Sequence, residues 1–411
     1  RRWRRGQAIL DIRLLMELKP GMPGYLDFAR GLMPLEIPLG VIKEGYSQVY
    51  WEPGQESNGT FLVLGASGAG KTEALKTLGK NIAEQAIPVL VIDFHGDVDF
   101  PGVNTVLLSA GMSSYVGINP LELDTCDALQ TGLYEQRDIQ LEMIRRVVRL
   151  GHKQHSLLGE VIAMAYQERG IHDGLPHTWG YEPPSLAEVL SMLQWRAAND
   201  GSADERNLAK GCISAVNSVF GHPVFQRRHY LTLTDLLRGN LRLDLSKINS
   251  EGVRYIIAET LLRKIFRAMR LQGHYPAGLV DDSQRFRLYI IIDEAKILST
   301  FGGNMNNSGH ILNILATEGR KYGIGLIMAS QMGEHFGHEV KASAGTCLVM
   351  KPLDHREAVQ NARNAQVSPQ ALHALSGRGD GYFLTSSNPI PQLIQVDRIS
   401  VEPRFAQEGI L

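Results

Sequence analysis

One stretch of this chain, residues 60–72, constrains its fold more than any other. It reads Thr-Phe-Leu-Val-Leu-Gly-Ala-Ser-Gly-Ala-Gly-Lys-Thr. The apolar run Phe61–Leu64 suits a buried strand, and after the glycines Leu75, Leu78 and Ile82 recur at helical spacing. A strand, a glycine loop and a helix start in this order predict a phosphate-binding loop.

The glycine loop has the form Gly-x-x-x-x-Gly-Lys-Thr, in which each residue type has a chemical use. Glycines allow backbone N–H groups to converge on phosphate oxygens, and the helix N-terminus adds a favourable dipole. In such loops the lysine reaches the β- and γ-phosphates and the threonine hydroxyl binds Mg²⁺. An ordinary glycine-rich turn is the alternative, and the flanking strand and helix argue against it. The residues predicted to bind ATP are Gly65, Ala66, Ser67, Gly68, Ala69, Gly70, Lys71 and Thr72.

Length and composition are those of a soluble globular protein. The chain has 411 residues, of which 44% are hydrophobic and 21% charged, enough for one large core or two modest ones. Its net charge of −1 argues against a wholly basic nucleic-acid binder but leaves room for a local basic patch.

Three features bear on the surroundings of the protein. Cys126, Cys212 and Cys347 are far apart and give neither a zinc pattern nor a disulfide framework, which suits a reducing cytosol. No run approaches the roughly 18 apolar residues that a membrane span needs. We therefore expect a cytoplasmic protein without membrane contact. The first residue is Arg1 rather than Met, which favours a fragment of a longer protein.

The strongest predicted strand, Leu288–Ile292, ends in the paired carboxylates of Asp293 and Glu294. In a phosphate-loop enzyme, Asp293 would orient Mg²⁺, directly or through water, and Glu294 would polarise the attacking water. A buried strand can also end in Asp-Glu for capping alone. The phosphate loop upstream favours the catalytic interpretation.

Polar side chains follow two further predicted strands. Val89–Ile92 is followed by Asp93 and Asp97, and Gly325–Ala329 is followed by Ser330 and Gln331. Acidic residues at the carboxyl end of a parallel strand lie where α/β sheets bind ligands. Asp93 and Asp97 therefore either approach the nucleotide or its water, or serve as a helix cap and loop carboxylates.

These elements predict an α/β fold, with a mostly parallel sheet flanked by helices and an inserted all-α subdomain. Three helix candidates, separated by turns, mark the insertion: Leu157–Tyr166, Ser185–Ala198 and Asn207–Phe220. The predicted organisation is an N-terminal segment 1–47, a nucleotide-binding core 48–127 and 225–387, a helical insertion 128–224, and an irregular C-terminal tail 388–411.

Together the motifs resemble the HerA–FtsK superfamily of ring-forming ATPases, and within it the HerA-like branch. The phosphate loop alone is unspecific, whereas Arg-Lys-Tyr-Gly-Ile-Gly and the Ala-Ser-Gln that follows it are more specific. The matching stretches lie within residues 36–385 and are Gly65–Thr72, Val91–Asp97, Ile118–Leu121, Ile290–Ala295 and Glu318–Gln331.

The resemblance implies a RecA-like core that assembles as a homo-hexameric ring, with ATP and Mg²⁺ at subunit interfaces and double-stranded DNA through the centre. It assigns Arg320 as the finger that completes a neighbour's catalytic site and Gln331 as a polar sensor, with Lys351 a weaker candidate for phosphate contact. From the residues alone, Arg320 could equally be a helix C-terminal cation that favours the dipole. Thr300–Gly309 is only a positional candidate for a DNA-contacting loop.

The leading hypothesis is an ATP-driven translocase of double-stranded DNA. A nuclease or restriction-system partner in phage defence is preferred, because the residues before Gln48 are too few for the N-terminal β-barrel usual in HerA-type motors. One alternative is a conjugation or secretion ATPase that acts on protein substrates. Another is a nucleotide-dependent switch or scaffold, against which Asp293 and Glu294 argue.

The segment Leu375–Gly381, Leu-Ser-Gly-Arg-Gly-Asp-Gly, predicts a turn before the strand Tyr382–Leu384. Its first residues faintly resemble the signature of transporter ATPases. That signature precedes the strand-end carboxylates, whereas this turn follows Asp293 and Glu294. The order therefore excludes a transporter-type ATPase.

Overall fold

A computed structural model describes residues 35–111, 114–123, 132–227, 229–237, 239–274, 286–301 and 309–399. Most of the predicted loop 300–309 lies outside these residues, as do most of the N-terminal segment and the end of the tail. Within the described residues, no helix combines the length and apolarity needed to cross a bilayer.

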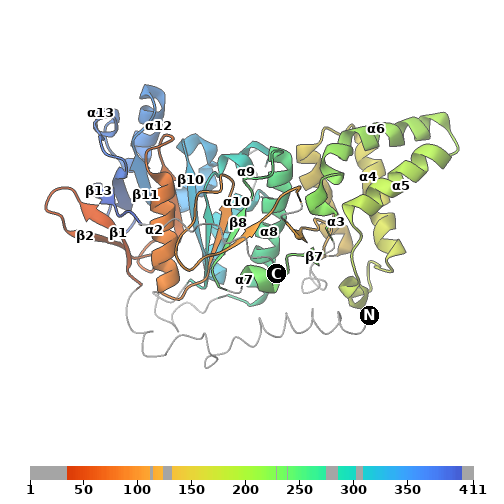
Figure 1. Ribbon diagram of the computed structural model, residues 1–411, viewed down its shortest axis with the longest axis horizontal. Coiled ribbons are helices and arrows are strands. Elements are labelled where there is room, and N and C mark those ends of the chain that lie inside the picture. Colours follow the sequence, from red (N-terminus) through yellow and green to blue (C-terminus); the bar gives the residue numbers. More distant parts are fainter. Residues whose placement is uncertain are drawn as a thin grey trace.

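A single large sheet forms the centre of the fold (Figure 1). The phosphate-loop strand β3 lies near its middle. Its order is β2-β1-β13-β12-β11-β3-β10-β9-β4-β8-β5. Neighbouring strands from β11 to β5 are parallel, and those from β2 to β11 are antiparallel. The α/β fold with a mostly parallel sheet is therefore confirmed. The strands are β1 (Ile37–Ile42), β2 (Gln48–Trp51), β3 (Thr60–Leu64), β4 (Val89–Asp93), β5 (Asn104–Leu107), β8 (Leu241–Asp244), β9 (Leu288–Ile292), β10 (Ile324–Ser330), β11 (Ala344–Met350), β12 (Asp380–Thr385) and β13 (Gln392–Val396).

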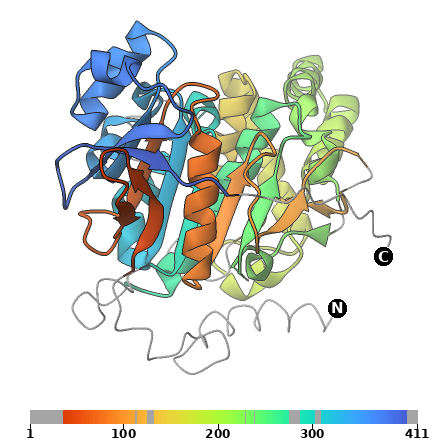
Figure 2. The ribbon, with the colours of Figure 1, turned by 60° about the vertical axis from the view of Figure 1, so that its left-hand side comes forward.

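Helices cover both faces of this sheet, because successive strand residues point to opposite sides. In β3, Phe61 and Val63 join the apolar cluster under α2 (Lys71–Glu84), the orange helix in front of the sheet in Figure 2. Leu62 and Leu64 join the cluster on the other face. That face is covered by α8 (Glu251–Leu271), α9 (Lys296–Phe301) and α10 (Ile311–Glu318).

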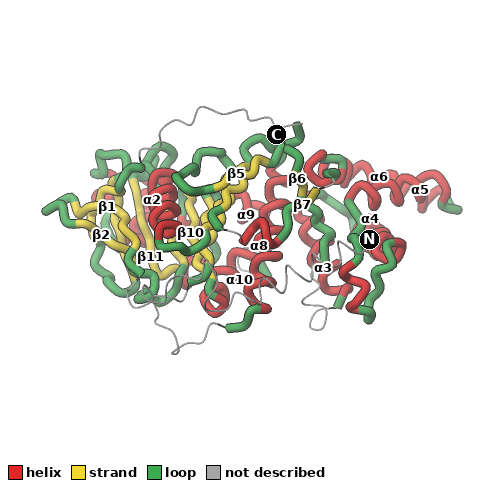
Figure 3. The backbone as a smooth tube through the Cα atoms, turned by 60° about the horizontal axis from the view of Figure 1, so that its bottom comes forward, coloured by secondary structure: helices red, strands yellow, loops and turns green. Residues whose placement is uncertain are grey.

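The helices of residues 133–220 extend from one end of the sheet (Figures 1 and 3). The short strands β6 (Val116–Gly117) and β7 (His229–Tyr230) pair in parallel at their base, so the chain enters and leaves this region at one place. The apolar side chains of the helices belong to the same cluster as those on the α8 face of the sheet, so the helices do not have a separate core. The helices are α3 (Leu133–Val147), α4 (His152–Glu168), η2 (Pro176–Gly180), α5 (Leu186–Asn199), α6 (Ala203–Phe220) and η3 (Pro223–Phe225).

Two strands extend the sheet beyond the limits predicted for the core. β1 lies within the predicted N-terminal segment, and β13 lies within the tail predicted to be irregular. β13 pairs with both β1 and β12, so the description of the tail as irregular is wrong for these residues. The prolines just before β13 argued against a strand in the sequence, although proline is compatible with the start of a strand. The remaining elements are α7 (Leu233–Leu237), η5 (Gly319–Tyr322), η6 (Gly333–His335), α11 (His338–Ser343), α12 (His355–Ala365) and α13 (Pro369–His373).

A buried ionic cluster joins the helical region to the core. The side chain of Glu259 in α8 is fully buried, and its carboxylate lies 2.6 Å from Arg263 Nη2 and 3.7 Å from Arg146 Nη1 in α3. Arg263 Nη2 also donates a hydrogen bond to Gly309 O, next to α10. Removing one partner of such a buried pair leaves an uncompensated charge in a medium of low dielectric constant.

We expect Glu259→Ala to lower the free energy of unfolding by about 3–5 kcal/mol, because both arginines lose their buried partner. Chemical unfolding followed by circular dichroism measures this change. The matched control is Glu160→Ala, whose side chain is 63% exposed and pairs with Arg196. An exposed pair of this kind contributes about 0–1 kcal/mol. Equal losses in the two variants would contradict a special role for the buried cluster.

Candidate functional site

The predicted phosphate loop connects β3 to α2 at the carboxyl edge of the sheet. Gly68 and Gly70 have φ values of +79° and +115°, which L side chains rarely adopt. The neighbouring strands bracket the start of the loop, because Gly65 N donates to Ser330 O and Ala66 N donates to Lys351 O. No side chain among the described residues caps α2, so its first amide groups are available for an anion.

Phosphate binding by a loop of this type uses a lysine and a hydroxyl, and both lie at the start of α2. Lys71 Nζ donates to Gly65 O at 2.8 Å and to Ala66 O at 3.0 Å. Burial lowers the pKa of Lys71, and the nearby carboxylates of Glu294 and Glu357 oppose this shift. Lys71 therefore lies folded over its own loop, within reach of any phosphate that the loop binds.

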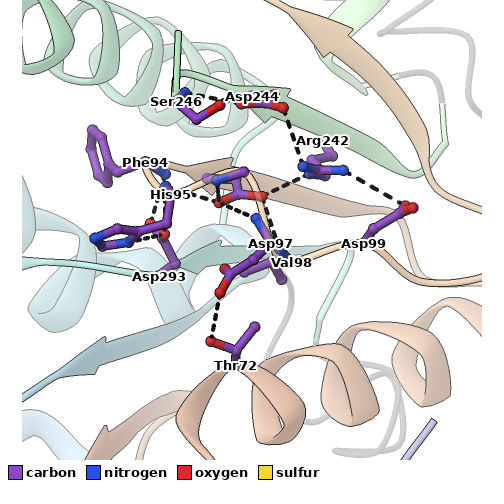
Figure 4. A network of polar contacts seen from close by, with 12 residues as sticks. Thr72, Phe94, His95, Asp97, Val98, Asp99, Arg242, Asp244, Ser246 and Asp293 are labelled. Atoms are coloured by element: carbon purple, nitrogen blue, oxygen red, sulfur yellow. Dashed lines mark hydrogen bonds and ion pairs between the residues drawn. The ribbon is translucent and has the colours of Figure 1, made fainter. Parts of the chain in front are cut away.

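Beside the phosphate loop, the segment after β4 is folded around a buried carboxylate (Figure 4). Asp93 is fully buried and accepts hydrogen bonds from Gly96 N at 2.7 Å and Val98 N at 2.9 Å. Arg242 in β8, which is 6% exposed, donates to the same carboxylate from Nε at 2.7 Å. These bonds fix the turn that presents Asp97, whose carboxylate accepts from the Thr72 hydroxyl at 3.2 Å.

The two carboxylates after β9 differ in their surroundings. Both oxygens of Asp293 accept hydrogen bonds, from Phe94 N at 2.9 Å and from His95 N and Nδ1 at 3.1 and 2.8 Å. Burial raises the pKa of Asp293 to about 6, and the hydrogen bond from His95 opposes this shift. Burial also raises the pKa of Glu294, against the charge of Lys71. Glu294 Oε1 is buried without a hydrogen-bond partner among the described residues, as expected of a group that waits for a water molecule.

These residues fit a divalent cation. Carboxylate oxygens of Asp93, Asp97 and Asp293 lie within 4.8 Å of one another, next to the Thr72 hydroxyl. Mg²⁺ prefers oxygen ligands and is usually bound by one or two carboxylates together with phosphates and water. Asp97 is the exposed member of the set, and it contacts Thr72 directly. Thr72 and Asp97 would thus hold the ion, with Asp293 behind them.

The two other predicted catalytic residues lie at opposite edges of the sheet. Gln331 follows β10 directly at the carboxyl edge, and its backbone oxygen accepts from Asn361 Nδ2 at 3.1 Å. Arg320 lies in η5, before the amino end of β10, and its guanidinium donates to Ser57 O, before β3. The structure brings Lys71, Thr72, Asp293 and Glu294 together with Gln331 nearby, but not with Arg320.

Sequence analysis missed Arg242 and His95. Leu-Arg-Leu-Asp is an ordinary alternating strand, in which the arginine is expected to face solvent. The sequence offers one sign that Arg242 is buried. β8 lies inside the sheet of an α/β protein, where helices usually cover both faces of a strand. His95 lies between the two predicted acids Asp93 and Asp97, and its contact with Asp293 depends on tertiary structure.

Comparison with known proteins places these residues among related chains. Residues 58–265 match the family model described as the central domain of helicase HerA. A DNA double-strand break repair helicase HerA from Sulfolobus acidocaldarius is 23% identical over 359 residues. The match covers 82% of this chain and 64% of that protein, so the chain spans less than two thirds of the relative's length.

Solved structures share the fold at lower identity. VirB4 of Thermoanaerobacter pseudethanolicus superposes with a TM-score of 0.67 and 16% identity, covering 89% of this chain and 96% of VirB4. The plasmid coupling protein TrwB, in complex with ADP and Mg²⁺, gives a TM-score of 0.61 and 14% identity, covering 87% and 89%. These likenesses confirm the predicted RecA-like phosphate-loop fold.

We expect Asp97→Asn to weaken Mg²⁺ binding at the nucleotide site at least about tenfold, because the site loses an exposed carboxylate beside Thr72. Losing even an outer partner of a metal ligand usually costs about tenfold or more. Titration of Mg²⁺ against protein with a fluorescent ATP analogue measures the effect. The control is Asp99→Asn, whose side chain is 39% exposed and lies 3.8 Å from Arg242 Nη1. If both variants need the same Mg²⁺ concentration as the unmodified protein, Asp97 has no part in binding the ion.

Proposed function

Because this chain belongs to the family defined by the HerA helicase central domain, we propose that it is an ATP-hydrolysing motor that translocates double-stranded DNA as a ring. One observation carries the proposal. Lys71, Thr72 and Glu294 meet at the carboxyl edge of the sheet, while Arg320 lies at the amino edge. One subunit would thus supply the phosphate-binding and water-activating groups at one edge of its sheet and the arginine at the other.

Hydrolysis requires a water molecule to attack the γ-phosphorus while the bond to the β-phosphate oxygen breaks. Glu294 has a buried oxygen that no described residue contacts by a hydrogen bond, and it lies near Lys71, so it is placed to accept the proton of that water. Lys71 would exchange its bonds to Gly65 O and Ala66 O for phosphate oxygens. A bound Mg²⁺ would neutralise charge that develops on the phosphates. Gln331, at the end of β10, would contact the γ-phosphate.

Geometry supports action of Arg320 on a neighbouring subunit. β10 runs parallel to β3, with Leu326 opposite Thr60 and Ser330 opposite Leu64. Arg320 comes before these paired residues in the chain, and the phosphate loop comes after them. The full length of the two strands therefore separates Arg320 from the phosphate loop. A strand advances about 3.3 Å per residue, which puts this separation beyond the reach of one side chain. If Arg320 stabilises the transferring phosphoryl group, it therefore acts on the nucleotide of another copy.

A homo-hexamer closed around DNA is the assembly we propose, because heterologous contacts of this kind form rings when the rotation closes. The grip on DNA would be through the phosphate backbone and hence sensitive to salt. A nuclease or restriction-system partner in phage defence stays a prediction from the resemblance. Action on protein substrates is the competing function, and stimulation by DNA separates the two.

We expect linear double-stranded DNA to stimulate ATP hydrolysis by the purified protein, and the stimulation to fall as salt rises because phosphate contacts are screened. Steady-state phosphate release with and without DNA measures this, alongside particle mass with ATP present. Lys71→Ala is the control that loses hydrolysis in both conditions. Hydrolysis that ignores DNA, in a particle that stays monomeric, would contradict the proposed motor.

We expect Glu294→Gln and Arg320→Ala each to bind ATP yet to lose at least about 100-fold in turnover, since they remove a general base and a phosphoryl-stabilising cation. Mixing the two variants should restore part of the activity, because some interfaces then combine an intact Glu294 with an intact Arg320. Phosphate release against mixing ratio measures the rescue. The absence of rescue at every ratio would show that Arg320 does not act between subunits.

A further inference from the structure

The position of the catalytic groups fixes where the nucleoside end of ATP must lie. Asp97, Glu294 and Gln331 follow β4, β9 and β10, all on one side of β3 in the sheet order. The γ-phosphate faces this side, since Glu294 is placed to activate its water. The nucleoside therefore leaves the phosphate loop on the other side, towards β11 and β12.

On that side the turn before β12 lies directly against the phosphate loop. Gly379 N donates to Ala69 O at 2.9 Å. A Cβ atom at Gly70 would lie 2.8 Å from Gly379 N, closer than real Cβ atoms approach. The turn and the phosphate loop are thus in backbone contact at the start of α2. This turn is the Leu-Ser-Gly-Arg-Gly-Asp-Gly segment that the predicted catalytic residues leave unused.

The backbone of this turn is held on several sides. Val396 N donates to Gly379 O at 3.0 Å, and Arg398 Nη2 donates to Arg378 O at 3.0 Å. Asp380, which is 1% exposed, accepts from Gly377 N at 2.8 Å and pairs with Lys43 Nζ at 2.7 Å. In contrast, the Arg378 side chain is exposed, and no described residue pairs with its guanidinium. A fixed backbone therefore carries an uncommitted arginine beside the nucleotide site.

We propose that Arg378 contacts the nucleoside end of ATP in its own subunit, with its guanidinium stacked on the base. This rests on the nucleotide site proposed above. The phosphates already have Lys71 and the free amides of α2 as partners, whereas no described residue yet serves the base. A guanidinium is planar and stacks on aromatic rings, which the compact ammonium group of lysine does not do in the same way. Arg378 thus contributes to nucleotide affinity and not to the hydrolytic step.

The experiment compares two ligands that share phosphates but differ in the base. Binding of ADP and of inorganic tripolyphosphate is measured by calorimetry or competition, without DNA. For Arg378→Ala we expect the Kd of ADP to rise about tenfold, within the range of a desolvated cation–π contact, and that of tripolyphosphate to stay unchanged. Arg378→Lys should resemble Arg378→Ala, and Arg378→Gln keeps a long polar side chain if the alanine variant folds poorly.

The matched control is Arg363→Ala, an exposed arginine in the last turn of α12, which should bind both ligands as the unmodified protein does. Unchanged ADP binding by the Arg378 variants overturns the proposal, and so does an equal loss for tripolyphosphate, which would indicate a phosphate contact. Equal losses in Arg363→Ala would indicate a general effect of charge and also overturn it. Absence of ADP binding in the unmodified protein would instead refute the nucleotide site itself.

Discussion

The buried carboxylate of Asp93 is the constraint on which the geometry of the site depends. An unpaired charge in this position would be strongly destabilising, and Arg242 removes the penalty by donating to it from the neighbouring strand. Asp93 then orders the segment after β4 through the amides of Gly96 and Val98. The ordered segment does two things at once. It supplies amide groups to Asp293, and it presents Asp97 to the hydroxyl of Thr72.

Strand order explains why one subunit gathers most of the candidate site residues at one edge of its sheet and places Arg320 at the other. Parallel strands place every carboxyl end at one edge, so residues that follow β3, β4, β9 and β10 meet there although they lie far apart in the chain. A residue that precedes β10 is placed at the opposite edge by the same rule. Arg320 therefore cannot join its own Lys71, and in the ring that we propose it would complete the site of a second copy.

The sequence predicted those parts of the candidate site in which a motif directly follows its own strand. Lys71 and Thr72 follow a continuous apolar strand, and Asp293 and Glu294 follow another, so pattern and position agreed. Arg242 could not be found in this way, because an arginine in an alternating strand looks like a solvent-facing residue. β13 was missed for a local reason, since nearby prolines outweighed the alternation of its side chains. The role of Asp97 was left open, because it depends on the distance between two loops.

The glycines of the two loops show why the turn before β12 belongs to the nucleotide site. Gly70 needs a positive φ of +115° to start α2, and its missing side chain is also what allows Gly379 to approach. The bond from Gly379 N to Ala69 O then ties the antiparallel part of the sheet to the phosphate loop. Lys43, directly after β1, and Arg398, in the segment after β13, hold the same turn. The antiparallel strands that sequence analysis left outside the core thus support the loop that binds phosphate.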